Sequence, residues 1–168
     1  EPCVYVNKNR DLIVLAYVDD MLAFSKFESN IKSFYRRLSE TIDMRVVGTP
    51  TKFLGVSVAY EQDSIILHQK DYIESVLRKF GMENCNPVTL PMEPGLKIKM
   101  HRGAPTEKPY RSLIGCLNSG GTRPDIMYVV NELSRVQSNP SDQHYAIAKK
   151  VLRYLSGTKC RSLKYRSN

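Results

Sequence analysis

The sequence lacks the features that mark several large classes of protein. No stretch approaches 18 uninterrupted apolar residues, the length that a membrane-spanning helix needs, and no secretory signal peptide is visible. The cysteines lie far apart, without a Cys-x-x-Cys pair or two neighbouring histidines, which disfavours a zinc site and leaves reduced thiols as the default. We therefore expect an intracellular protein with no membrane partner, cut from a longer polypeptide because it opens on Glu1 rather than on Met.

The charge of the chain is unevenly distributed. Residues 1–60 carry eight Lys and Arg against seven Asp and Glu, residues 61–100 carry five against six, and residues 101–168 carry twelve against four. The whole excess of the +8 net charge therefore lies in the last segment. Such a basic region favours a polyanion as partner, most commonly a phosphate backbone, although a role in solubility alone is the alternative.

Two adjacent acids, Asp19 and Asp20, separate the apolar runs 12–18 and 21–24. Two short β-rich runs joined by two residues predict a hairpin with both carboxylates at its tip. The pair offers neither Gly nor Asn, which a tight hairpin turn prefers. Carboxylates on an apolar support favour a compensating cation, and Mg²⁺ binds one or two carboxylates together with phosphate oxygens. Ordinary turn chemistry, in which Asp bonds its local backbone, is the alternative.

The hydrophobic pattern predicts an α+β fold, with an antiparallel sheet backed by helices and a helical, basic C-terminal region. Ser25 and Glu28 form a predicted capping box at the start of the first helix, and Gly81 is the predicted end of the second. The expected strands are 3–6, 12–24 as a hairpin, and 51–60 with 64–69 as a second hairpin; the expected helices are 27–42, 70–80, 110–117, one from 122–125 onward, and one from Asn139-Pro140 to Gly157.

Five prolines between residues 84 and 109 predict a linker or an extended wrap, and the main boundary of the chain. Lys97-Ile98-Lys99 within it is a predicted short edge strand. Arg123 precedes a helix, where a cation is unfavourable, so we predict that it pairs structurally with Asp125 or with a backbone carbonyl.

A series of short motifs extends along nearly the whole chain. The first is Tyr17-Val18-Asp19-Asp20, which lies between apolar strands. The further motifs are Phe53-Leu54-Gly55-Val56, Phe80-Gly81-Met82-Glu83-Asn84-Cys85, Tyr110-Arg111-Ser112-Leu113-Ile114-Gly115-Cys116-Leu117, Thr122-Arg123-Pro124-Asp125-Ile126 and Leu152-Arg153-Tyr154-Leu155-Ser156-Gly157-Thr158. The first motif resembles the active-site hairpin of reverse transcriptases, and the whole series, in this order, resembles the reverse transcriptase region of the copia-type retrotransposon polyprotein. In one respect the chain departs from the family, which usually has a longer apolar helical segment in place of Asn118–Gly121.

The resemblance implies the second part of a palm followed by a thumb or connection, without the fingers and the first palm motif. Residues 1–83 would be the partial palm with a hairpin like the primer grip, 84–109 the proline-rich linker, and 110–168 the thumb-like or connection-like helical region. In the parent protein such a palm copies RNA into DNA by two-metal nucleotidyl transfer, acting on an RNA/DNA template–primer duplex and a dNTP.

The resemblance also assigns roles to individual residues. Asp19 and Asp20 are the implied catalytic carboxylates and metal ligands, and Tyr17 and Val18 line the nucleotide and the primer terminus. Phe53, Leu54 and Gly55 are the implied primer-gripping residues; the alternative is a glycine at a β-bulge, with Phe53 and Leu54 in the core. The implied contacts to the nucleic-acid backbone are Arg135, Lys149, Lys150, Arg153, Lys159 and Arg161.

A working two-metal site needs one more carboxylate from another strand, because neighbouring strand residues point to opposite faces. In the family that carboxylate lies on an earlier palm strand, and Glu1 and Asp11 are poor substitutes for it. We therefore expect the isolated chain to be inactive, to bind Mg²⁺ or Mn²⁺ weakly, and to require the missing N-terminal part of the polymerase or a second copy. The alternative is a non-catalytic nucleic-acid binder or a domesticated interaction protein. The expected location is the cytoplasm, the nucleus or a particle derived from the element.

Overall fold

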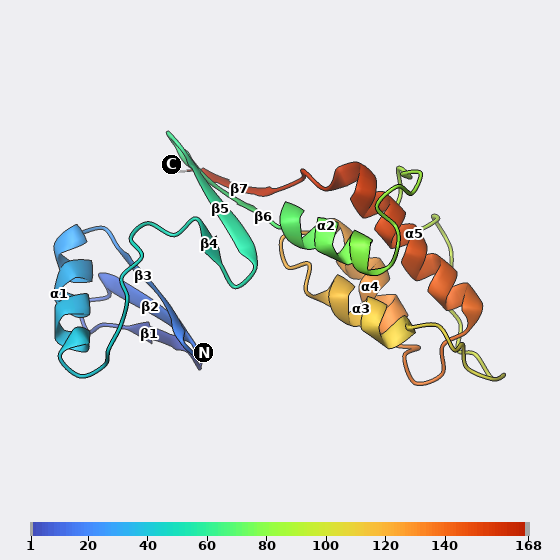
Figure 1. The fold of residues 1–168 in the computed structure, drawn as a ribbon, viewed down its shortest axis with the longest axis horizontal. Helices are drawn as coiled ribbons and strands as arrows, with labels where there is room; N and C mark the ends of the chain where they lie inside the picture. The colour runs from blue at the N-terminus through green and yellow to red at the C-terminus, as the bar shows by residue number, and fades with distance from the viewer. Residues whose placement is uncertain (1, 167–168) are drawn as a thin grey trace. The chain divides into compact units, whose positions relative to one another are not determined.

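The chain forms two compact units, Glu1–Thr49 and Pro50–Asn168, and each is described by itself. The structure is a computed structural model that describes residues 2–166, so Glu1 and the last two residues lie outside it. Both units combine antiparallel strands with helices, which confirms the predicted α+β class (Figure 1). No helix within residues 2–166 is long and apolar enough to cross a membrane.

The first unit is a three-stranded antiparallel sheet with one helix. Its strands β1 (Val4–Val6), β2 (Leu12–Tyr17) and β3 (Asp20–Ser25) lie in sequence order and are followed by α1 (Glu28–Ser39). The register pairs Tyr17 with Asp20, so the two-residue turn consists of Val18 and Asp19. The predicted hairpin is therefore present, but its turn lies one residue earlier than the Asp19-Asp20 pair, and Asp20 opens β3.

The predicted capping box at Ser25 is wrong. Helix α1 begins at Glu28. The preceding residue, Phe27, has an extended backbone (φ −113°, ψ 116°), and no side-chain hydrogen bond caps the helix there. Ser25 is the last residue of β3, where its hydroxyl donates to the Asp11 carbonyl at 2.6 Å and accepts the Phe27 N–H at 3.1 Å. The Ser25 side chain therefore stabilises the end of β3 and does not cap the helix. Helix α1 also ends earlier than predicted, at Ser39 and not at Ile42.

The second unit contains a four-stranded antiparallel sheet in the order β4-β5-β6-β7. Strands β4 (Lys52–Phe53), β5 (Val56–Glu61) and β6 (Ser64–His68) form the predicted second hairpin, turning at Gln62 and Asp63. Strand β7 (Leu163–Arg166) comes from the end of the chain and pairs with β6. This strand was not predicted, although its residues alternate between apolar and basic as a strand's do.

Four helices close the core of the second unit. They are α2 (Lys70–Lys79), α3 (Tyr110–Asn118), α4 (Pro124–Ser134) and α5 (Asp142–Thr158). The predicted apolar stripes are confirmed, since the buried side chains include Ile73, Val76, Leu77, Ile126, Val129, Val130, Leu133, Val136, Ala148, Leu152 and Leu155. Helix α5 starts later than predicted: Ser141 is the N-cap and exchanges hydrogen bonds with His144, so Pro140 lies before the helix.

Residues 84–109 contain no helix or strand, so the predicted edge strand at Lys97–Lys99 is wrong. Cys85, Val88, Met92 and Ile98 pack partly buried against the helical core. The segment therefore lies along the second unit as an extended wrap, and the division between the compact units falls at residues 49 and 50 instead.

Arg123 joins the start of α4 to the end of α5. Its side chain is 1 % exposed and donates to both carboxylate oxygens of Asp125, at 3.0 and 2.8 Å, and to the carbonyl and hydroxyl of Thr158, at 3.0 and 2.7 Å. Tyr154 donates its hydroxyl to Asp125 at 2.6 Å. The predicted structural role of Arg123 is confirmed, with an acid and a backbone carbonyl as partners at once.

The cluster of Arg123, Asp125 and Tyr154 makes the second unit less stable at acid pH. Burial alone would raise the pKa of Asp125, but the hydrogen bonds from Arg123 and Tyr154 outweigh it and lower the pKa from 3.8 to about 2. Because the folded-state pKa is depressed, the stabilisation is complete above pH 4 and is lost as the pH falls towards 2.

We therefore expect the unfolding free energy, followed by helical circular dichroism, to fall by about 2 kcal/mol between pH 4 and pH 2 through Asp125 alone. Asp125→Asn should remove that part of the pH dependence, whereas Asp63→Asn in the β5–β6 turn should keep it. An unchanged slope in Asp125→Asn would contradict this assignment.

Candidate functional site

The tip of the β2–β3 hairpin carries the predicted acids on a strained turn. Val18 has φ +53° and is 86 % exposed, and both Asp19 and Asp20 are exposed. A β-branched residue in the left-handed region is an outlier that costs about 1–3 kcal/mol. No buried contact offsets this cost, because the valine side chain lies in solvent. Strain of this kind is expected where the turn serves a function instead of stability.

Asp20 lies on one particular face of the sheet in the first unit. Residues opposite each other on antiparallel strands share a face, and alternate residues along a strand do so too. Asp20 therefore shares its face with Tyr17 and with an apolar set, which we name the open face. Its members are Val4, Val6, Ile13, Leu15, Tyr17, Asp20, Leu22 and Phe24.

The open face is uncovered, and the opposite face is not. Val4, Val6, Ile13, Tyr17 and Phe24 on the open face are each 40–56 % exposed. Val14, on the other face, is the one buried apolar residue among the described residues of this unit, and α1 packs against β3. The open face is therefore a large apolar surface with one carboxylate at its edge.

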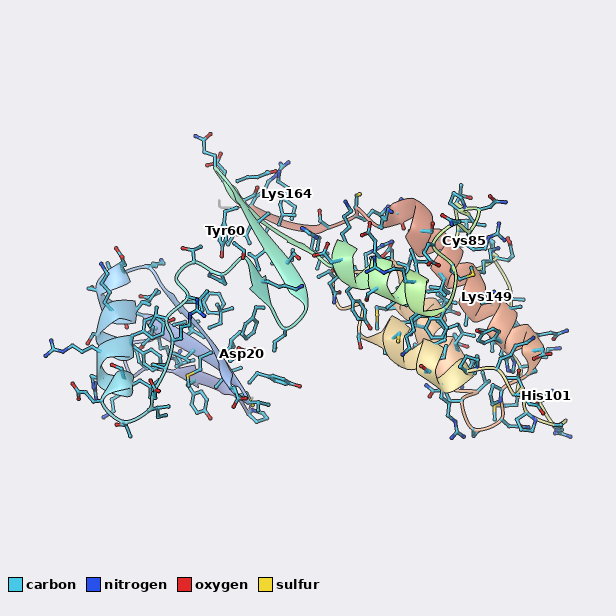
Figure 2. The ribbon with its side chains drawn as sticks, in the orientation of Figure 1. Asp20, Tyr60, Cys85, His101, Lys149 and Lys164 are labelled. Carbon is cyan, nitrogen blue, oxygen red and sulfur yellow. The ribbon has the colours of Figure 1, made fainter. Side chains whose placement is uncertain are left out.

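The donor set at the tip suits a hard divalent cation only in part. Carboxylate oxygens are the ligands that Mg²⁺ and Mn²⁺ prefer. Within residues 2–166, neither carboxylate has a hydrogen-bond or ion-pair partner, and no group of three His, Cys, Asp or Glu comes together that could hold a metal. Asp19 stands in the turn, where strand alternation does not fix the direction of its side chain. Asp19 and Asp20, the second of which is labelled in Figure 2, therefore form an incomplete set of ligands.

The β4–β5 hairpin carries the second predicted site. Its two-residue turn consists of Leu54 (φ +48°) and Gly55 (φ +79°), and two positive φ values are typical of a type I′ turn. Gly55 adopts this backbone freely, whereas Leu54 is strained and 47 % exposed. The glycine therefore sits in a turn and not in a bulge, and Leu54 is presented outward while Phe53 is half-buried.

Most of the predicted backbone-contacting cations have a partner within the chain. Lys150 pairs with Glu93, Arg135 with Glu132 and Lys159 with Glu74. Arg153 donates to the Asn86 carbonyl at 2.7 Å, and Arg161 donates to the Tyr154 hydroxyl at 2.7 Å. Lys149, on α5, is the one member of the set without such a partner among the described residues. These contacts of Glu93 and Asn86 could not be predicted from the local sequence, because the two residues lie 57 and 67 residues away from their partners.

Comparison with known proteins points to one family. A sequence model of the family described as reverse transcriptase (RNA-dependent DNA polymerase) matches residues 2–94. The chain is 38 % identical over 173 residues to the retrovirus-related Pol polyprotein from transposon TNT 1-94 of Nicotiana tabacum, with 94 % of the chain and 13 % of the polyprotein covered. It is 34 % identical to the polyprotein from transposon RE1 of Arabidopsis thaliana, with 86 % and 10 % covered.

A shorter relative covers a similar region. The uncharacterized mitochondrial protein AtMg00810 of Arabidopsis thaliana is 31 % identical, with 88 % of this chain and 62 % of that protein covered. The chain thus spans about a tenth of the polyproteins that it matches and less than two thirds of this shorter relative. No solved structure shows significant similarity to the chain.

The two strained turns lead to a stability prediction. Val18→Gly and Leu54→Asn each place a residue that tolerates positive φ at the strained position, and each should stabilise its own unit by about 1 kcal/mol. Thermal unfolding measures this gain. Ala59→Gly, in the middle of β5, should instead destabilise the second unit. Loss of stability in both turn variants would show that these side chains are held for packing.

Proposed function

The chain belongs to the reverse transcriptase (RNA-dependent DNA polymerase) family of copia-type retrotransposon polyproteins, and we propose that it supplies two metal-binding carboxylates and the primer contact of such a polymerase. The observation that carries this proposal is the exposed Asp19 and Asp20 on a strained hairpin tip beside an uncovered apolar face. The parent protein would copy RNA into DNA by nucleotidyl transfer.

Asp19 and Asp20 would hold Mg²⁺ or Mn²⁺ between them and a third carboxylate. When bound, the metal ions supply charge neutralisation for the triphosphate and a lower pKa for the attacking hydroxyl. Tyr17 shares a face with Asp20 and Val18 projects from the turn, so both are placed to line the nucleotide and the primer terminus. Asp20 would fix the position of the metal site relative to the sheet, because it belongs to a regular strand.

The position of the third carboxylate follows from the order of the strands. Neighbouring strands lie about 4.8 Å apart, so an added strand beyond β1 would be separated from β3 by two intervening strands. A strand paired to the outer edge of β3 would instead lie directly beside Asp20. We propose that the missing N-terminal part of the polymerase, or a second copy, adds its carboxylate at this edge.

The open face supports a protein partner for the first unit. It carries no Lys or Arg, so it offers nothing to neutralise phosphates, and its exposed apolar side chains would be covered favourably by another apolar surface. The remainder of the palm would therefore pack here. Nucleic acid would approach the hairpin tips and the basic helices instead.

The primer would contact the β4–β5 turn, where Leu54 projects outward and Gly55 leaves room for a close backbone approach. Phosphate groups along the template–primer duplex would be contacted by Arg135, Lys149, Lys150, Arg153, Lys159 and Arg161. Five of these residues first have to exchange a partner within the chain for a phosphate.

A non-catalytic role in nucleic-acid binding or protein interaction is the second candidate. It is favoured by the absence of a third ligand for a metal within residues 2–166 and by the existence of a short relative covering the same region. In that case the hairpin acids would have no role in primer extension.

Metal binding by the isolated chain should be weak, because two carboxylates alone give few charges. We expect dissociation constants for Mg²⁺ and Mn²⁺ on the order of 1 mM, measured by calorimetry or by NMR shifts of the hairpin amides. Asp19→Asn or Asp20→Asn should weaken binding further, while Asp43→Asn should leave it unchanged. Saturation at micromolar metal would contradict the proposal of a missing ligand.

Transplantation tests the function itself. The 173-residue region of the tobacco polyprotein that matches this chain is replaced by the chain, and primer extension on an RNA template is measured. The graft should extend primers, and Asp19→Asn or Asp20→Asn should reduce the rate by at least about a thousandfold, as loss of a metal ligand does when it abolishes transition-state stabilisation.

Asp63→Asn, in the turn of the β5–β6 hairpin, is the control for this graft and should keep full activity. Extension that is indifferent to Asp19 and Asp20 would overturn the catalytic proposal and favour the non-catalytic candidate.

A further inference from the structure

The proline-rich wrap lies along α5 in the opposite direction to the helix. Near the C-terminal end of α5, a Cβ at Gly157 would lie 2.8 Å from the Cβ of Pro87, so only a glycine there lets the wrap lie this close. Nearer the N-terminal end, His144 and the Lys99 carbonyl are hydrogen-bonded at 2.9 Å. We name residues 86–99 the strap. Figure 2 labels Cys85 just before it and Lys149 on the helix that it follows.

Between these two ends the strap contacts the cations of α5. The Arg153 side chain donates to the Asn86 carbonyl at 2.7 Å, and the Lys150 ammonium pairs with the Glu93 carboxylate. The Lys150 side chain is 25 % exposed, whereas the Glu93 side chain is 62 % exposed. The strap thus supplies two oxygen acceptors to neighbouring cations on one helix, and the acidic one faces solvent.

Oxygen acceptors of this kind are what a nucleic-acid backbone offers. Carboxylate and phosphate oxygens both accept charge-assisted hydrogen bonds from Lys and Arg. Lys149 and Arg153 are four residues apart and therefore neighbours on the helix surface, and Lys150 is adjacent to Lys149 in the chain. The three cations span about one helical turn, so they can contact one or two consecutive phosphates.

We infer that Lys149, Lys150 and Arg153 form a phosphate-binding surface for a nucleic-acid backbone, and that Glu93 of the strap covers it as an internal competitor. The inference rests on the proposed function, since it assumes a nucleic-acid partner, and it adds a regulated surface to it. A nucleic acid would displace the Glu93 carboxylate from Lys150, while the buried contacts of Val88 and Ile98 keep the strap on the core.

The contact at Glu93 is suited to reversible exchange. An ion pair this exposed is screened by water and adds little to stability, so opening it costs little. A nucleic acid presents many phosphates at once, and each neutralised phosphate releases counterions. Competition should therefore favour the nucleic acid at low salt and the strap at high salt.

The test uses the full chain and a fluorescently labelled 20-base-pair DNA duplex, with affinity measured by anisotropy over a range of salt concentrations. Glu93→Gln should bind roughly threefold tighter than the wild type at every salt concentration, with the same slope of log K against log salt, because both complexes neutralise the same number of phosphates once the carboxylate is displaced. Glu107→Gln is the matched control, because it removes the same charge from an exposed acid with no ion pair among residues 2–166, and its affinity should stay close to that of the wild type.

Lys150→Gln supplies the second arm. It should weaken binding, and adding Glu93→Gln to it should produce no further change in affinity, because the competitor then has no cation to release. Hydrogen exchange gives an independent readout: amides near Glu93 should exchange faster when the duplex is bound, and those of α5 should not.

The outcomes separate this inference from the function on which it rests. Duplex binding by the wild type with equal affinities for Glu93→Gln and Glu107→Gln would overturn the inference alone. Failure of every variant to bind the duplex at low salt would overturn both the inference and the proposed nucleic-acid partner. Tighter binding by Glu93→Gln that vanishes in the Lys150→Gln background would support the inference.

Discussion

The register of one strand pair determines what the first unit can do. Tyr17 lies opposite Asp20, so the turn contains Val18 and Asp19, and Asp20 faces the same side as the apolar residues of all three strands. A shift by one residue would move Asp20 to the face covered by α1, because side chains alternate with a period of two. The strained backbone of Val18 is the consequence of this register, since a two-residue turn here needs positive φ at a position that holds valine.

The two units differ in how completely they bury their apolar residues. The second unit has a continuous core of helix residues, and each of the three side-chain nitrogens of Arg123, which is 1 % exposed, donates to Asp125 or Thr158. No buried side-chain nitrogen or oxygen in the described residues lacks a partner. The first unit buries Val14 and leaves a sheet face in solvent. Closed packing stabilises the unit that carries the basic helices, whereas the unit that carries the acids has a surface suited to a further protein segment.

Much of the fold could be predicted from the sequence because the local apolar pattern agrees with the way in which the helices and strands pack. The helical stripes of α2, α4 and α5 and both hairpins follow directly from apolar periodicity, and the awkward place of Arg123 at a helix start correctly indicated an ion pair. The errors arose where a side chain had two possible uses. Ser25 closes a strand instead of capping a helix, and Ser141 caps α5 in place of the preceding Asn139-Pro140.

Long-range pairing could not be predicted in the same way. Strand β7 joins β6 from nearly a hundred residues away, and Gln69 holds the short Asn118–Gly121 connection by accepting hydrogen bonds from Thr122 and donating to the Ser119 carbonyl. This connection is the segment in which the sequence predicts a departure from the family. One glutamine from the start of α2 therefore supplies the contacts there, and nothing in the local sequence indicates it.

Because most of the predicted backbone-contacting cations have partners within the chain, the net charge affects long-range attraction and close contact differently. An internal ion pair leaves the sum of charges unaltered, so the long-range field of a chain with charge +8 still attracts polyanions. Close contact is a different matter, because Lys150, Lys159 and Arg161 each already hold an oxygen of the chain. In the proposed complex, different groups would thus govern attraction and docking: the total charge would set how often a nucleic acid arrives, and the exchange of internal acceptors for phosphates would set how long it stays bound. Lys149 would need no such exchange, so it is the position in the predicted set from which binding would begin.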